Sequence, residues 1–205
     1  MGTGTATVVA ACLFAFTAIN LENLLRHHTI RSATSGKPQI EKQIRTPLFL
    51  AGVGTIAFFL ESFIFVFLAF IEIKQLSFIS SLDIRTIRIG VFEPLGLIVM
   101  VLGYVVFVWS VVARGRYATS WQMPADHKLV DWGPYRYVRH PSYLAYFLMF
   151  LGFLLLWGNL LALIPLTAVP GYVWISFREE EMLVAKFGDR YMRYRKRAGR
   201  FIPRG

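Results

Sequence analysis

Cysteine is almost absent from this 205-residue sequence, and internal repeats and low-complexity tracts are missing altogether. The single cysteine, Cys12, lies inside an apolar run, which excludes an intramolecular disulfide and a cysteine-rich metal site. A thiol in apolar surroundings stays protonated, and this argues against a nucleophilic role for Cys12. The chemistry of the chain must therefore depend on other side chains, and we expect no metal ligands.

Acidic residues are also scarce, because Lys and Arg number 22 and Asp and Glu only 12, for a net charge of +10. In a soluble protein such an excess suggests a nucleic-acid partner. Here 56% of the residues are apolar and the mean hydropathy is +0.52, so no basic stripe lies on a soluble fold. We therefore predict that the basic residues face anionic lipid headgroups and that no nucleic acid is bound.

The apolar residues are concentrated in five long blocks joined by short polar connectors. This pattern predicts an all-α, polytopic membrane helical bundle, with five transmembrane helices and a cytoplasmic carboxyl-terminal helix. The first block is too long for the core of a signal peptide and has no basic residues before it, so we interpret it as a span. The blocks cover residues 5–25, 46–73, 91–113, 141–157 and 159–177, and an amphipathic helix is predicted over 179–194.

The distribution of Lys and Arg predicts the orientation of this bundle. Five of these residues fall in 26–45, five in 114–140 and nine in 178–205, but only three fall in 74–90. With five spans the three rich segments share one side, which the positive-inside rule places in the cytoplasm, with the amino terminus outside. We expect one integrated membrane domain, located in the cell membrane of a prokaryotic host. Residues 1–113 would supply three spans, and 114–205 the catalytic region.

The loop before the fourth block contains the first group of candidate reactive side chains. Pro141 suits the first position of a helix, so Arg139 and His140 lie where the chain enters the fourth span. An arginine and a histidine beside the free amides of a helix end form a compact receptor for a carboxylate or a phosphate. A turn at Gly133–Pro134 would fold the next residues over this receptor. Contact with lipid headgroups is the alternative, and it stays open for Arg136.

Three consecutive carboxylates, Glu179 to Glu181, form the second group. Glu179 or Glu180 could bind a cationic ammonium group, whereas Glu181 fits better with stabilisation of a helix amino terminus. Only Gly158 and Asn159 separate the fourth and fifth blocks, so the two helices must be antiparallel. Both groups of polar residues should therefore lie close together at one end of the hairpin.

The order of these residues resembles the isoprenylcysteine carboxyl methyltransferase family, and it is similar to the related membrane phospholipid methyltransferases. The resemblance covers residues 127–203 and is specific as an ordered set rather than in any single piece. This chain is shorter than the eukaryotic members and looks like a prokaryotic relative, for example an archaeal one. The residues that carry the resemblance are His127-x-Leu129-Val130, Gly133-x-Tyr135, Arg139-His140-Pro141-x-Tyr143, Glu179-Glu180-x-x-Leu183 and Phe187-Gly188-x-x-Tyr191-x-x-Tyr194.

The resemblance implies a membrane enzyme that uses S-adenosyl-L-methionine, releases S-adenosyl-L-homocysteine and methylates a lipophilic acceptor that enters from the bilayer. The expected reaction is carboxyl O-methylation of a prenylcysteine-like group, with phospholipid N-methylation as the alternative. By the same resemblance, Arg139, Glu179 and Glu180 are the candidate catalytic residues. The candidate cofactor-binding residues are His127, Leu129, Val130, Gly133, Tyr135, His140, Pro141, Tyr143 and Glu180.

Two other classes of function stay open at this point, an NADPH-dependent membrane reductase and a small transporter. A transporter would need ionisable groups near the middle of the spans, where Glu61 is almost alone. Glu61 could contact substrate or pair with a polar neighbour such as Asn20 to fix helix packing. For a methyltransferase, a carboxylate acceptor is already ionised at neutral pH and needs no base. An amine acceptor would need one, and Glu179 or Glu180 could serve.

Overall fold

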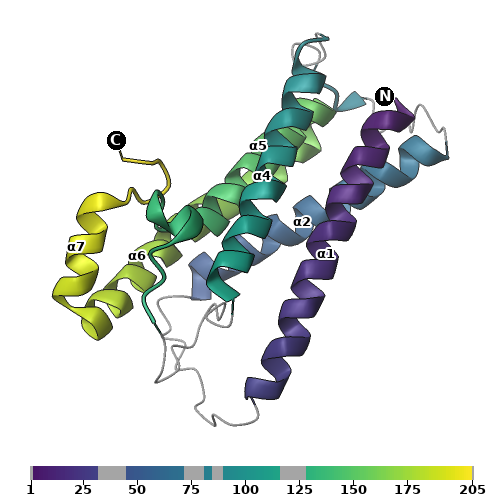
Figure 1. Cartoon of the computed structure of the whole chain (residues 1–205). Helices are drawn as coiled ribbons and strands as arrows, with labels where there is room; N and C mark the ends of the chain where they lie inside the picture. The colour runs from purple at the N-terminus through teal and green to yellow at the C-terminus, as the bar shows by residue number, and fades with distance from the viewer. Residues whose placement is uncertain (1, 32–44, 72–80, 85–89, 116–127, 205) are drawn as a thin grey trace.

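The computed structural model describes residues 2–31, 45–71, 81–84, 90–115 and 128–204. Long helices form a bundle, from which the end of α6 and the short α7 project at one side (Figure 1). The α-helices are α1 (Thr3–Arg31), α2 (Arg45–Phe70), α4 (Phe92–Arg114), α5 (Pro141–Trp157), α6 (Ala168–Phe187) and α7 (Asp189–Arg197). Two 3-10 helices, η3 (Gly133–Arg136) and η4 (Leu160–Thr167), complete the described elements.

The prediction of an all-α membrane bundle is confirmed. Within the described ranges, four stretches are long and apolar enough to cross a membrane, namely α1, α2, α4 and the continuous η4–α6 segment. The remaining apolar helix, α5, has 17 residues and is therefore about 25 Å long, which is less than the ~30 Å of a bilayer core. It is more enclosed than the others, because about half of its residues are buried by the surrounding helices.

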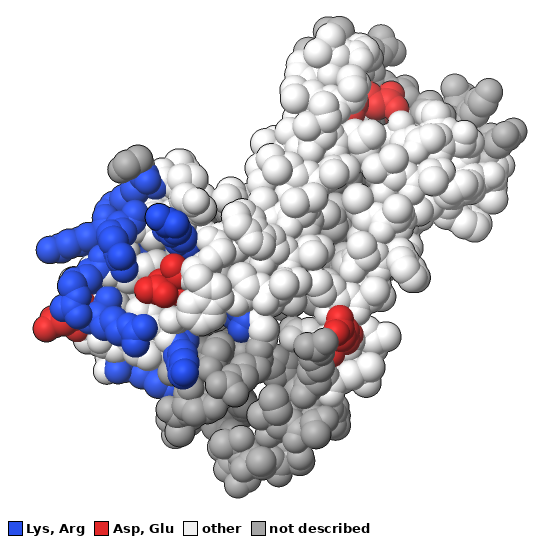
Figure 2. Space-filling model, viewed as in Figure 1, with Lys and Arg blue, Asp and Glu red and all other residues white. Residues whose placement is uncertain are grey.

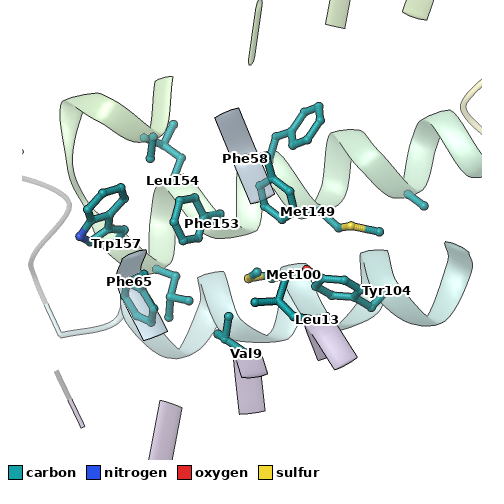
Figure 3. Close-up of a cluster of buried hydrophobic side chains, with 14 of the residues drawn as sticks. Val9, Leu13, Phe58, Phe65, Met100, Tyr104, Met149, Phe153, Leu154 and Trp157 are labelled. Carbon is teal, nitrogen blue, oxygen red and sulfur yellow. The ribbon is translucent and has the colours of Figure 1, made fainter. Parts of the chain in front are cut away.

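Close contact between α4 and α5 depends on glycine. A Cβ atom on Gly152 would lie 2.4 Å from the backbone nitrogen of Met100, and one on Gly96 would lie 2.4 Å from that of Leu156. The helix backbones can approach this closely only without side chains at these positions. Around the contact, Phe58, Phe65 and Phe153 gather with residues of α1 and α4 into one apolar core (Figure 3).

The turn between α5 and η4 confirms the predicted hairpin. Gly158 has a φ of 60°, a left-handed conformation that ends α5, and its amide donates to the carbonyl of Leu154. The Asn159 side chain accepts a hydrogen bond from the amide of Leu161 and donates one to Asp83. The chain then runs back along α5, so that the ring of Tyr172 in α6 stacks on Tyr146 in α5 at 5.2 Å.

The predicted helix over 179–194 is wrong in its bounds. α6 continues from the last apolar block through Glu179–Glu181 to Phe187, and α7 begins separately at Asp189. Gly188 separates them with a φ of 51°, a conformation that favours glycine and stops the helix. The apolar positions of the pattern still meet, because Leu183, Phe187, Tyr191 and Tyr194 pack in one cluster with Leu129.

Candidate active site

The chain before α5 is held in place by the carboxyl-terminal tail, defined here as residues 198–204. Val138 and Gly199 form a parallel bridge, in which the amide of Arg139 donates to the carbonyl of Gly199 at 2.8 Å. The amide of His140 donates to the carbonyl of Arg200 at 3.1 Å. Two segments about 60 residues apart thus fix the backbone that carries Arg139 and His140.

Glu180 is the centre of a buried ion cluster. Its carboxylate accepts two hydrogen bonds from Arg200, at 2.9 and 3.0 Å, and contacts Nε and Nη2 of Arg139, each at 3.0 Å. Nε2 of His140 lies 3.3 Å away, and Nε of Arg195 lies 3.7 Å away. Three arginines and a histidine therefore surround one carboxylate, which joins α6, the loop before α5 and the tail.

Arg139 contacts Glu180 through two nitrogens of its guanidinium, Nε and Nη2. The third nitrogen of its guanidinium, Nη1, donates to the carbonyl oxygens of Arg195 and Ala198. Its side chain is 5% exposed, so all of its donor atoms face protein groups rather than solvent. The structure thus gives Arg139 a positioning contact that sequence reasoning had not considered.

Glu179 differs from its neighbour in having fewer partners. Tyr143 donates its hydroxyl to Oε1 at 2.7 Å, and Nδ1 of His140 lies 3.4 Å from Oε2. The Glu179 side chain is 19% exposed, against 4% for Glu180. Because a carboxylate has about four lone-pair positions, Glu179 keeps capacity to accept hydrogen bonds from a ligand, whereas Glu180 is saturated.

His140 lies between the two carboxylates. Both of its ring nitrogens face a carboxylate oxygen, and only the doubly protonated imidazolium has a donor on each nitrogen. Burial acts to lower the pKa of His140, but the hydrogen bonds and charges of Glu179 and Glu180 outweigh it, so the pKa is raised above its ordinary value. The ring also stacks on Tyr143 at 5.5 Å.

The candidate residues Leu129, Val130 and Tyr135 are buried and build the wall behind the ion cluster. Leu129 packs against Tyr191 and Tyr194, while Val130 packs with Tyr135. The carbonyl oxygen of Tyr135 accepts a hydrogen bond of 2.6 Å from the hydroxyl of Tyr194. This wall therefore connects the loop before α5 with α7.

The remaining candidates have different surroundings. Gly133 has a φ of 59°, and a Cβ there would lie 2.8 Å from Cβ of Ala113, so both conformation and space favour glycine. Pro141 begins α5 as predicted. Arg136 is exposed, whereas Tyr135 from the same turn is buried. His127 lies outside the described residues.

Sequence reasoning missed three arginines near the site. Arg195 and Arg200 join the cluster from the tail region, where no periodicity or motif marks them. Arg114, at the end of α4, has a buried Nε atom with no hydrogen-bond partner among the described residues, and its charge acts on Tyr143 and Tyr146. The sequence could have pointed to Arg114, because it directly follows an apolar block. A basic residue at the end of a span lies at the same depth as a site formed by the ends of the spans.

Glu61 lies away from this cluster, in the middle of α2. It is 8% exposed, and its Oε2 atom has no hydrogen-bond partner in the part of the chain that the structure describes. The side-chain amide of Asn20 donates instead to the carbonyl of Phe16, so the pairing suggested by sequence is not formed.

A model of a known family matches the region that contains Arg139, His140, Glu179 and Glu180. Residues 92–190 match the model of the phospholipid methyltransferase family. The chain is similar to protein-S-isoprenylcysteine O-methyltransferase of Schizosaccharomyces pombe, with 42% identity over 83 residues, 38% of this chain and 34% of the relative. The protein of the same name from Tribolium castaneum is 31% identical over 120 residues, 53% of this chain and 41% of the relative. The chain thus spans less than half the length of these relatives.

A solved structure is also similar, that of the eukaryotic intramembrane Ras methyltransferase ICMT (isoprenylcysteine carboxyl methyltransferase). It aligns with a TM-score of 0.50 and 27% identity, over 80% of this chain and 54% of that one. The helical bundle, the ordered residues of the cluster and these similarities agree with one another. This chain is therefore similar, in its helical fold and in its carboxyl-terminal region, to the isoprenylcysteine carboxyl methyltransferases.

Proposed function

We propose that this chain is a membrane methyltransferase that transfers a methyl group from S-adenosyl-L-methionine to the carboxyl group of a prenylcysteine-like acceptor. The observation that carries the proposal is the buried ion cluster of Arg139, His140 and Glu180 with the partly exposed Glu179 beside it. All four residues lie in the region that matches methyltransferases.

The charges of the cluster fit the methionine half of the proposed cofactor, which has an ammonium and a carboxylate group. Glu179 has free acceptor capacity for the ammonium. The positive charges nearby exceed the negative charges of Glu179 and Glu180, because they come from Arg139, Arg195, Arg200 and the His140 imidazolium. This excess of positive charge favours binding of the cofactor's carboxylate. The bound cofactor would supply a methyl group activated by its sulfonium.

Arg114 is our candidate for binding the acceptor. Its Nε atom has no partner among the described residues, and its position at the end of α4 suits a carboxylate presented from the bilayer, a contact that burial would strengthen. A carboxylate acceptor is ionised at neutral pH, so alignment and loss of its water shell are the main tasks of the protein. Tyr143 and Tyr146 would exclude water beside it.

The test is incubation of the purified protein with S-adenosyl-L-methionine, radiolabelled in its methyl group, and N-acetyl-S-farnesylcysteine. We expect label that alkali releases as volatile methanol, because methyl esters are base-labile. Glu179→Gln should lose most of this activity, whereas Glu181→Gln should keep it, since Glu181 is exposed and pairs with Arg178. Absence of base-labile label with an active cofactor site would contradict carboxyl methylation.

Phospholipid N-methylation is the second candidate, because the matching family model is described as phospholipid methyltransferase. An amine acceptor must lose a proton, and Glu179 would be the base. In this case phosphatidylethanolamine would acquire label that alkali does not release as methanol. Supplying both acceptors in one assay distinguishes the two reactions.

A further inference from the structure

The short helix α7 presents a strongly basic face to the outside. Tyr191 and Tyr194 are buried, and at about 100° per residue the opposite side of the helix is centred on Met192, Arg193 and Lys196. All three of these side chains are exposed. Lys and Arg accordingly cover this end of the molecule, while the bundle itself is almost free of charge on the face shown (Figure 2).

Contacts within the described chain do not balance this charge. Arg190, Arg193 and Lys196 form no ion pair with any residue that the structure describes. Arg197 lies 3.9 Å from Asp131 but is 72% exposed. The only acid on α7 is Asp189, in its first turn. The face therefore has several cations available for an external anion.

Helix stability explains only part of this pattern. Arg195, Lys196 and Arg197 occupy the last turn of α7, where positive charge interacts favourably with the helix dipole. Arg190 lies in the first turn, where positive charge is unfavourable, and Arg193 gains nothing from either end. An anion outside the described part of the chain would account for these two residues.

The position of α7 relative to the end of α4 indicates that lipid headgroups are the nearest anions. The indole of Trp132 donates to the carbonyl of Ala113 in the last turn of α4, so this exposed tryptophan lies where a span ends. Exposed Trp side chains are typical of the membrane interface. The preceding residue, Asp131, contacts Arg197 of α7. The carboxyl end of α7 therefore lies at the level of the lipid headgroups.

We propose that the exposed basic residues of α7, with Arg193 and Lys196 on its outer face and Arg190 and Arg197 beside that face, bind the headgroups of anionic phospholipids. Exposed Met192 lies within this face and suits the boundary between headgroups and acyl chains. The same helix reaches the ion cluster, because Arg195 lies 3.7 Å from Glu180 and its carbonyl accepts from Arg139. Anionic lipid thus steadies the helix that encloses the candidate active site.

The experiment measures lipid selectivity in proteoliposomes of phosphatidylcholine that contain traces of spin-labelled phosphatidylglycerol or spin-labelled phosphatidylcholine. The motionally restricted fraction of each label gives the ratio of their association constants with the protein. For the wild-type chain at low salt we expect a ratio on the order of fivefold in favour of phosphatidylglycerol, falling as salt is added. Arg190→Gln/Arg193→Gln/Lys196→Gln should lower the ratio towards one.

A matched variant, Arg190→Lys/Arg193→Lys, keeps the charge and should keep the selectivity. Circular dichroism and thermal unfolding in detergent check that each variant is folded. If the triple variant is unstable, the salt dependence of the wild-type ratio decides, because a salt-independent ratio overturns the proposal. Unchanged selectivity in a folded triple variant also overturns it. So does equal association of both lipids together with tight binding of a soluble polynucleotide, which would point to a soluble anionic partner.

Discussion

The amino-terminal helices and the carboxyl-terminal region are stabilised in different ways. α1 contacts the rest of the bundle through small and aliphatic residues such as Ala6, Val9 and Leu13. Only 17% of the residues in its most apolar stretch are buried by the rest of the chain. The carboxyl-terminal region has a buried carboxylate, Glu180, at its centre, which contacts the loop before α5, α7 and the tail. Loss of one contact should therefore matter little in the first region and much in the second.

The two regions should respond differently because an apolar contact in the bundle can be replaced by a contact with lipid, whereas a buried ionic contact cannot be replaced. An apolar side chain on a lipid-facing bundle exchanges protein contacts for lipid contacts at little difference in free energy. A buried cation that loses its carboxylate has no replacement, because neither lipid nor water can reach it. Single substitutions in the two regions can test this contrast, beginning with the one that should matter most.

Glu180→Gln should have the largest effect. It leaves Arg139, Arg200 and His140 without a shared counter-charge, and breaking a buried ion pair typically costs about 3–5 kcal/mol. We expect a matching loss in the free energy of unfolding in detergent, measured by chemical denaturation. Glu181→Gln is the control, because its pair with Arg178 is exposed and should contribute little. Equal stability of the two variants would show that the cluster does not hold the region together.

Arg139→Lys should be next in size. A lysine keeps the charge but cannot contact Glu180 and two backbone carbonyls at once, because only a guanidinium has that planar arrangement of donors. The expected loss of methyl-transfer rate is on the order of tenfold to a thousandfold, or ~1.4–4 kcal/mol. Arg136→Lys, at an exposed position in the same loop, should keep its rate. Calorimetry with S-adenosyl-L-homocysteine separates lost cofactor affinity from a lost rate, and normal values for both would remove Arg139 from the site.

Gly152→Ala tests the contact between α4 and α5, where the absence of side chains lets two helix backbones approach closely. The added methyl would lie 2.4 Å from the backbone nitrogen of Met100, so α4 and α5 must separate, at a cost of about 1–3 kcal/mol. Gly52→Ala is the matched control in α2, because no atom lies within 4 Å of its added Cβ. Thermal unfolding of both variants in the same detergent measures the difference. A destabilised Gly52→Ala with an unchanged Gly152→Ala would reverse our view of where the bundle is tightly packed.

The helices and the meeting of the two polar groups could be predicted because both follow from local features. Apolar length predicts the spans, and the connection at Gly158–Asn159 allows only an antiparallel return, which brings His140 to Glu179. Arg200 could not be predicted, because it reaches Glu180 from an extended tail without periodicity.

The different surroundings of the two glutamates were equally hidden. Adjacent helix positions point about 100° apart, and only the packing of α6 decides which side chain enters the ion cluster. Sequence reasoning therefore left Glu179 and Glu180 as equal candidates, whereas the structure buries Glu180 among arginines and leaves Glu179 partly exposed. The inside–outside orientation of the bundle stays a prediction from the distribution of Lys and Arg.

The smallest effect should be a pH dependence that comes from His140. Its pKa is raised in the folded chain, so the imidazolium contributes stability that is fully present below the ordinary pKa of about 6.5 and is lost as pH rises through the raised value. Glu180, which faces it, stays ionised across this window, because burial would raise the pKa of this carboxyl but the hydrogen bonds from His140, Arg200 and Arg139 outweigh burial and lower it. The wild type should therefore be more stable than His140→Gln near pH 6, and the difference should shrink towards pH 9. Each tenfold gain in proton affinity on folding corresponds to about 1.4 kcal/mol of this difference.

Thermal unfolding of the wild type and of His140→Gln between pH 6 and pH 9 measures the difference directly. A gap that widens with pH would mean that the folded chain prefers neutral His140, and the imidazolium between two carboxylates would have to be abandoned.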